Sequence, residues 1–339
     1  MAWRRKSAVF MIDNYIWVLL VFLVAVAAIF IPKFFSTQNF LNVFYQSTSF
    51  SMMVLGMTFC LLIGQFDLSI ESVFAFGPAI GTLFMLHWFP HSSPYLAILV
   101  TLVAGSAVGL FNGLMTVKLG VNAFLQTLCM LIILRGFVLF LIPMGIYQIP
   151  NPYLLLGEYV IPGTRFPIAI IVCLLLFLLA HLIITRTPFG KNLIASGSNP
   201  RAAFLAGIDT GKLRIWAFIL SGTLAALGGL LLVGRMGAVT NSMGNGDIMQ
   251  VFAAAVLGGI SLDGGKGSIS GALGGVLVLS MISNVLNLGG VSPFLIQAIQ
   301  GVLLLLAVVI ENFRESFYRL VTRQDIRRVI NDNEQRASA

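Results

Sequence analysis

Charged residues are scarce in this chain. Asp, Glu, Lys and Arg make up 9% of its 339 residues, whereas hydrophobic residues make up 58%. A soluble domain carries about a quarter charged residues, so this chain could not cover its surface with polar groups. The composition therefore excludes a soluble enzyme and a disordered scaffold.

Cysteine and histidine are also rare, with three of each. Cys60, Cys129 and Cys173 lie within apolar runs, so we expect neither a disulfide framework nor a metal site. The segment 259–267 superficially resembles a phosphate-binding loop, but Gly267 stands where a Ser or Thr would bind magnesium. We therefore expect no catalytic residue, no metal, no cofactor and no nucleotide site in this chain.

Long apolar runs dominate the sequence, and its mean hydropathy is +0.97. A helix needs about 20 such residues to cross a bilayer. The runs are continuous rather than alternating, which favours helices over a transmembrane β-barrel. The sequence predicts an all-α, polytopic integral membrane protein with ten spans: 15–32, 42–63, 68–88, 94–117, 120–142, 167–185, 213–234, 247–262, 267–288 and 293–311. The eighth is short and flanked by glycines, which indicates a partial or re-entrant helix buried in protein.

The basic residues predict the orientation of these spans. If the N-terminus is cytoplasmic, 16 of the 20 lysines and arginines lie on the cytoplasmic side, as the positive-inside rule requires. Both termini and the 186–212 loop should then be cytoplasmic, and the 143–166 loop external. Because topology accounts for the net charge of +8, no nucleic-acid partner is expected. The domain is predicted to cover 1–313, with a charged cytoplasmic tail at 314–339.

The N-terminus has the outline of a signal peptide, with a basic start and an Ala25-Val26-Ala27 site. Its apolar run continues to Ile31, which favours an uncleaved first helix that stays among the membrane lipids.

A glycine motif occurs twice. Residues 105–113 and 267–275 both read G-S-x-x-G-x-x-x-G. In the predicted topology the two copies lie in helices of opposite direction, as an inverted internal repeat requires. Small residues at this spacing also pack ordinary membrane helices, so the motif alone leaves both interpretations open.

Few ionisable residues fall within the spans. Asp67 opens the third span, where it can cap the helix N-terminus, and Glu71 follows one turn later. Arg135 lies within the fifth span, where we expect it to pair with a carbonyl or an acid between helices.

Uncharged amides are more numerous in the spans. They suit a hydroxyl-bearing neutral solute, because an amide both donates and accepts hydrogen bonds. Several are spaced three or four residues apart, which would put each pair on one helix face. Hydrogen bonding between helices is the alternative for each of them. The candidate substrate path comprises Asn112, Asn122, Gln126, Asn284, Asn287, Gln297 and Gln300.

The cytoplasmic loop contains a short predicted helix. Asn199 suits its N-cap, Pro200 its first position, and Gly207 its stop. A helix of about seven residues is unstable alone, so we expect it to dock against another protein. Its small face would comprise Ala202, Ala203 and Ala206.

This segment resembles the cytoplasmic coupling loop of the ribose/xylose-type sugar ABC importer permeases. Further segments resemble signatures of that family, in the same order and over almost the whole chain. They are Phe35–Asn39, Asp67–Ser69, Asn112-Gly113, Thr127-Leu128, Arg135-Gly136, Val256–Leu262 and Gly264–Ser268.

The resemblance implies a permease subunit in a bacterial plasma membrane that imports a ribose-, xylose- or galactose-like monosaccharide or a similar small polar solute. It implies a second permease subunit, cytoplasmic ATP-binding subunits that hydrolyse ATP, and an extracytoplasmic solute-binding protein. The short helix, with Asn199, Pro200, Ala202, Ala203, Ala206 and Gly207, would couple the chain to the ATP-binding subunit. A branched-chain amino-acid-type ABC permease and a self-contained secondary transporter stay open as alternatives.

Overall fold

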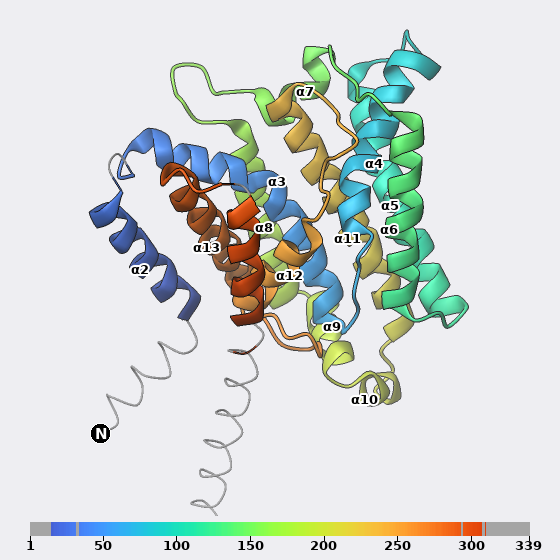
Figure 1. Ribbon diagram of the computed structural model, residues 1–339. Coiled ribbons are helices and arrows are strands. Elements are labelled where there is room, and N and C mark those ends of the chain that lie inside the picture. The colour runs from blue at the N-terminus through green and yellow to red at the C-terminus, as the bar shows by residue number, and fades with distance from the viewer. Residues whose placement is uncertain (1–14, 32–33, 293, 307–308, 310–339) are drawn as a thin grey trace, which may run out of the picture.

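The computed structural model describes residues 15–31, 34–292, 294–306 and 309 (Figure 1). The predicted tail at 314–339 lies outside these residues. In the part described, regular structure is helical apart from two isolated β-bridges, Ile146–Val239 and Val160–Pro167.

The elements follow one another along the chain, and each of the ten predicted spans contains a helix. They are α2 (Tyr15–Phe30), α3 (Thr37–Leu62), α4 (Ile70–Leu83), the π-helix η1 (Phe84–Trp88), α5 (Pro94–Lys118), α6 (Ala123–Leu141), α7 (Asn151–Glu158), α8 (Ile168–Arg186), α9 (Pro188–Ser198), α10 (Pro200–Leu205), α11 (Thr210–Met236), α12 (Ile248–Leu257), α13 (Ile269–Leu288) and a helix at Phe294–Leu306.

Six of the described helices are long and apolar enough to cross a membrane: α4 with η1, α5, α6, α8, α11 and α13. The helix α3 has 26 residues but is more polar, and its second half is buried inside the bundle. Figure 1 shows α7 at one end of the bundle and α9 and α10 at the other. The loops predicted to be external and cytoplasmic therefore lie at opposite ends.

The helix α12 is a half-helix. Its 10 residues span about 15 Å at 1.5 Å per residue, half of the roughly 30 Å hydrocarbon core. Most of its side chains are buried, including Val251 and the run Ala253–Leu257. The helix of the eighth predicted span is therefore short and buried in protein, as its flanking glycines indicate.

Glycine allows the central helices to approach closely. A Cβ at Gly109 of α5 would lie 2.1 Å from the carbonyl oxygen of Phe218 in α11. A Cβ at Gly222 of α11 would lie 2.2 Å from the carbonyl oxygen of Gly105. Backbone therefore packs directly on backbone at this crossing, as small residues permit in membrane helices.

The glycine motifs lie on helices that pack in different places. The helix α11 packs against α4 and α5, whereas α3 packs against α12 and α13. The two G-S-x-x-G-x-x-x-G motifs also occupy different positions. The first lies inside α5, whereas the second starts in the loop before α13, where Ser268 is the N-cap.

Candidate functional site

The short helix α10 has the ends that the sequence predicts. Asn199 is its N-cap, and its Oδ1 accepts a hydrogen bond from the Ala202 backbone N–H at 3.0 Å. Pro200 occupies the first turn, and Gly207 follows the helix with φ +82°. The helix has six residues rather than seven, and it protrudes at the end of the bundle opposite α7 (Figure 1).

The predicted small face of α10 is not one exposed surface. Ala202 and Ala206 are exposed, but Ala203 is only 5% exposed. Ala203 faces the protein because α10 packs against α9 and α11. The prediction that Ala203 belongs to an accessible face, where bulk would leave the fold intact, is therefore wrong.

The exposed tip of α10 is apolar instead. The side chains of Phe204 and Leu205 are 69% and 79% exposed. The sequence prediction selected the small residues of this segment. It did not consider that Phe204 and Leu205 occupy the exposed last turn of a helix that ends at Leu205. The next helix, α11, begins after the N-cap Asp209, which accepts a hydrogen bond from the Lys212 backbone N–H. That bond lowers the pKa of the Asp209 carboxyl.

Two of the predicted path amides belong to a buried polar cluster, which we define as Asp67, Ser69, Asn112, Gln126 and Ser221. Asn112 is fully buried and donates to Ser69 Oγ at 2.9 Å, while Gln126 donates to Asn112 Oδ1 at 3.4 Å. These bonds join α5 and α6 to the segment before α4. In this conformation Asn112 and Gln126 have the environment of amides that hold helices together.

Asp67 lies at the centre of the buried polar cluster and does not cap a helix, contrary to the sequence prediction. One carboxylate oxygen accepts from Ser69 Oγ at 2.5 Å, and the other accepts from Ser221 Oγ of α11 at 2.7 Å. The helix α4 begins at Ile70 with Ser69 as its N-cap, and the backbone N–H from which Asp67 accepts is that of Ser69 rather than one of the first turn.

The other predicted amides are dispersed. Asn122 is the N-cap of α6 and accepts from the backbone N–H groups of Phe124 and Leu125. Asn122 therefore lies outside the helix. The spacing predicted that it shares a helix face with Gln126, and the structure shows that it does not. The local reason is the strong preference of Asn for N-cap positions.

Near α13 two of the predicted amides join neighbouring helices, and a third bonds within its own helix. Asn284 exchanges two hydrogen bonds with Asn39 of α3, at 3.1 and 3.0 Å. Gln300 donates to Ser283 Oγ at 3.0 Å. Asn287 is exposed and donates to the Ser283 backbone carbonyl. Sequence reasoning missed Asn39, which lies outside the predicted second span.

Arg135 has the partners that its position predicts. Its guanidinium donates to the backbone carbonyls of Asn241 and Met243, both at 3.0 Å, and lies 3.4 Å from Glu71 Oε1. The other oxygen of Glu71 accepts from the Ile248 N–H at 3.3 Å, at the N-terminus of α12. Glu71 and Arg135 thus hold the half-helix α12 and the segment before it against α4 and α6.

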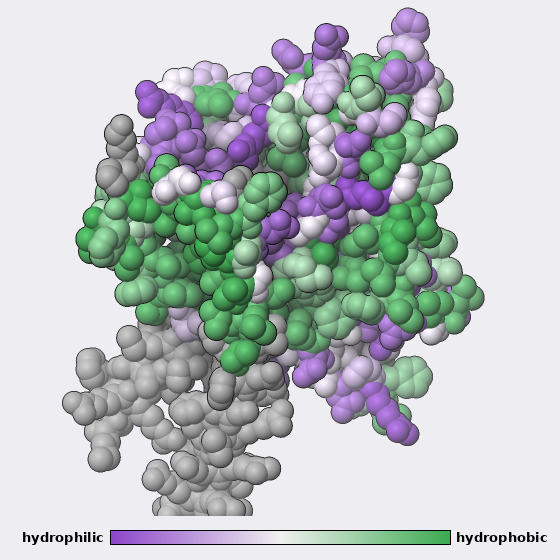
Figure 2. Space-filling model, viewed as in Figure 1, coloured by the Kyte–Doolittle hydropathy of each residue, from purple (hydrophilic) through white to green (hydrophobic). Residues whose placement is uncertain are grey.

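The segment 237–247 leads from the end of α11 down to α12 (Figure 1). Ser242 and Asn245 of this segment are exposed, as is Gln297 of the adjacent helix. The Gln297 Nε2 lies 3.7 Å from the position that a Cβ at Gly246 would occupy. Figure 2 shows hydrophilic side chains interrupting the hydrophobic surface on the face of the molecule that it displays. Polar groups within the hydrocarbon region of a bilayer avoid lipid and mark protein contacts or water-filled routes.

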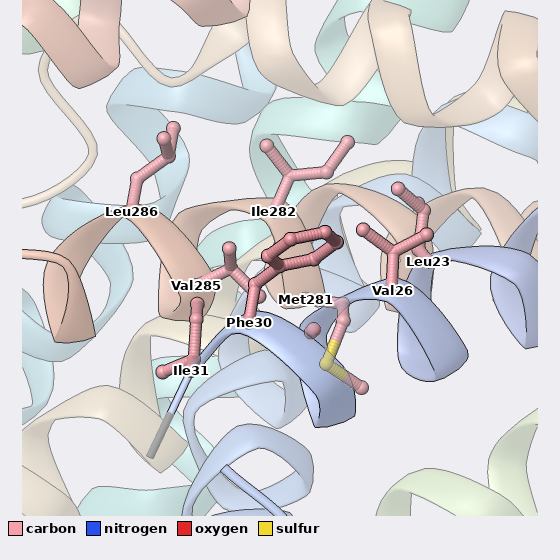
Figure 3. A pocket seen from close by; sticks show the side chains of 9 residues that line it. Leu23, Val26, Phe30, Ile31, Met281, Ile282, Val285 and Leu286 are labelled. Atoms are coloured by element: carbon pink, nitrogen blue, oxygen red, sulfur yellow. The ribbon is translucent and has the colours of Figure 1, made fainter.

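A groove between α2 and α13 differs in chemistry. Only apolar side chains line it (Figure 3). They are Leu23, Val26, Ala27, Phe30, Ile31, Met281, Ile282, Val285 and Leu286. The groove offers no side chain that could bind the hydroxyl groups of a sugar, and it suits a hydrocarbon chain instead.

The structure therefore defines a helical membrane protein with a capped helix projecting at one end and polar contacts between its helices. Among the residues described, no group of three or more His, Cys, Asp or Glu could hold a metal ion. Residues 39–308 match the family described as "Branched-chain amino acid transport system / permease component". The chain belongs to this family of permeases, whose members are multi-pass proteins of the bacterial inner membrane.

Curated relatives are similar over most of the chain. The ribose import permease protein RbsC of Haemophilus influenzae is 32% identical, over 90% of this chain and 94% of its own length. RbsC of Bacillus subtilis is also 32% identical, over 85% and 89%. The L-arabinose transport system permease protein AraH of Escherichia coli is 33% identical, over 87% and 88%. No solved structure matches the chain.

Proposed function

We propose that this chain is the membrane-spanning permease subunit of an ABC importer for a monosaccharide. The observation that carries the proposal is the similarity, over nearly the full length, to permeases named for ribose and arabinose import. The capped, projecting helix α10 supports it, because its exposed apolar tip suits docking to another protein.

The proposed assembly has three kinds of partner. ATP-binding subunits would bind at the α10 end of the bundle and hydrolyse ATP, while a solute-binding protein would deliver the sugar at the α7 end. A second permease subunit, identical or different, would complete the route. This arrangement puts both termini in the cytoplasm, as the distribution of basic residues favours.

Two alternatives are less well supported. A branched-chain amino acid would fit the description of the matching family, but a zwitterion needs charged partners in the route, and Glu71 and Arg135 are already bound to each other and to backbone. A secondary transporter does not account for the similarity to import permeases.

For the substrate route we propose Asn287 and Gln297. Both are exposed, and in the proposed topology they would lie near the outer ends of their helices. Amides suit sugar hydroxyls, and exposed amides would be costly against lipid. Among the described residues, Asn287 bonds only to a carbonyl of its own helix. The remaining amides bind other segments or cap a helix, so we expect their loss to affect packing first; they are Asn112, Asn122, Gln126, Asn284 and Gln300.

The double variant Asn287→Ala/Gln297→Ala should lower sugar uptake into membrane vesicles by about tenfold or more. The amount of permease in the membrane should stay normal. Asn284→Ala is the matched control, because it removes an amide from the same helix that binds Asn39. We expect Asn284→Ala to lower the melting temperature in detergent. Sugar uptake per folded permease in the membrane should stay unchanged. Normal uptake by the Asn287 and Gln297 variants would remove them from the route.

Coupling is tested at the tip of α10. Leu205→Asp introduces a charge on a side chain that is 79% exposed, so the permease should fold and reach the membrane. It should lose co-purification with the ATP-binding subunit and lose uptake. Leu119→Asp is the matched control, because this leucine is 67% exposed at the same end of the bundle. Full association and uptake in Leu205→Asp would show that α10 is not the coupling element.

A further inference from the structure

Three segments that are distant in sequence meet beside the start of α10. They are the end of α3 at 62–64, the end of α9 at 197–198 and the loop between α12 and α13 at 264–265. We call these segments the glycine junction. It includes Gly264 and Gly265, which belong to the segment Gly264–Ser268 that resembles a family signature. The proposed function assigns no role to this segment.

Hydrogen bonds made by Gly265 hold the glycine junction together. The Gly265 N–H donates to the Leu62 carbonyl oxygen at 2.9 Å. The Ser198 hydroxyl, at the end of α9, lies 3.0 Å from the Ile194 carbonyl oxygen of its own helix and 3.3 Å from the Gly265 carbonyl oxygen, and it shares its proton between them. Since its N–H is bound to Leu62, Gly265 does not present a free N–H to a phosphate group.

The three segments also approach too closely for side chains. A Cβ at Gly197 would lie 2.0 Å from the Leu62 carbonyl oxygen and 2.7 Å from the Gly265 nitrogen. A Cβ at Gly264 would lie 2.7 Å from the Gly64 Cα. Gly64, Gly264 and Gly265 all have positive φ, of +71°, +85° and +71°. Around Gly197 and Gly264 the contact is therefore backbone against backbone, and the short Ser198 side chain fills the remaining space beside Gly265.

Each segment continues into an element that the proposed transport cycle uses. Ser198 is followed by Asn199 and α10, the proposed docking helix. Gly64 leads through the buried polar cluster into α4, which carries Glu71. Gly264 and Gly265 follow the half-helix α12, whose N-terminus Glu71 caps. The glycine junction thus lies between α10 and both elements that Glu71 joins.

We propose that the glycine junction is the point at which a movement of α10 reaches α4 and α12 together. The inference rests on the proposed role of α10 in docking the ATP-binding subunit. A rigid contact between α9, α3 and the loop after α12 transfers a displacement of α9 and α10 to both halves of the chain, because packed backbone moves as one body.

Gly197→Ala tests this proposal. Its backbone is helical, so alanine suits the conformation, and the added Cβ alone forces α9 away from Leu62. The variant should keep its association with the ATP-binding subunit and basal ATP hydrolysis. Uptake should fall at least tenfold, and the stimulation of ATP hydrolysis by sugar-loaded binding protein should be lost. Ala195→Ser is the matched control, because it adds one atom on the exposed side of α9 and should leave all four measurements unchanged.

Ser198→Ala provides a milder second variant if Gly197→Ala fails to reach the membrane. It removes the hydroxyl shared between the Gly265 and Ile194 carbonyls without adding bulk, and a helix tolerates loss of the bond within α9, so uptake should fall about two- to fivefold while association persists. Full uptake and full stimulation in whichever variants fold would overturn the proposal. Its failure is distinguishable from failure of the docking role, because Leu205→Asp reports on association and the junction variants report on transport after association.

Discussion

Arg135 illustrates how the fold retains a charged side chain inside a mainly apolar bundle. Its side chain is 15% exposed and that of Glu71 is 6% exposed. The carbonyls of Asn241 and Met243 add two charge-assisted hydrogen bonds. The sequence predicts that such a residue pairs between helices, but the identity of its partners depends on the segment 237–247, more than one hundred residues away.

We expect Arg135→Met to destabilise the protein by about 2 kcal/mol, because it leaves Glu71 and two carbonyls without a charged donor. Unfolding midpoints in detergent would measure this loss. Arg165→Met is the control, since this exposed arginine makes one long contact with Gln38 at 3.4 Å, and its loss should cost below about 0.5 kcal/mol. Equal midpoints for the two variants would contradict the assigned role of Arg135.

At the scale of the elements, glycine determines which helices can touch. The helices α5 and α11 meet through Gly105, Gly109 and Gly222, whereas a Cβ at Gly136 of α6 would have no neighbour within 4 Å. The sequence shows the repeated glycines but not their partners. The repeated glycine motif predicts a small-residue face on each helix that carries it. In the structure, this face of α5 meets α11, and this face of α13 meets α12.

Gly109→Val should destabilise the packing of α5 on α11 by about 3 kcal/mol, because overpacking of a close contact displaces backbone. Gly136→Val should change stability by less than about 1 kcal/mol, since Val and Gly differ little in helix propensity. Thermal unfolding of the two purified variants in the same detergent measures the difference. A Gly109→Val protein as stable as the Gly136→Val protein would show that the crossing can relax.

At the scale of the whole molecule, α7 and α10 lie at opposite ends of the bundle (Figure 1). The positive-inside rule assigns the α10 end to the cytoplasm. Glu158 of α7 and Lys191 of α9 are both exposed, so they suit labelling from either side of the membrane.

In intact cells, a membrane-impermeant thiol reagent should label Glu158→Cys and should not label Lys191→Cys. Both variants need a Cys129→Ser background, because Cys129 is exposed while Cys60 and Cys173 are buried. Permeabilised cells provide the control, since Lys191→Cys should then react. Labelling of Lys191→Cys in intact cells would reverse the predicted orientation.

The sequence by itself determined the fold class, the approximate positions of the spans, the short eighth helix and the caps of α10. These features follow from hydropathy and from hydrogen bonds between residues a few positions apart. Only the tertiary structure decided that Asn112 and Gln126 are buried beside Asp67, that Asn284 pairs with Asn39, and that Ala203 faces inward. Such contacts join segments tens to hundreds of residues apart. Their pairing depends on how helices are oriented around their axes, which near-uniform apolar sequences specify weakly.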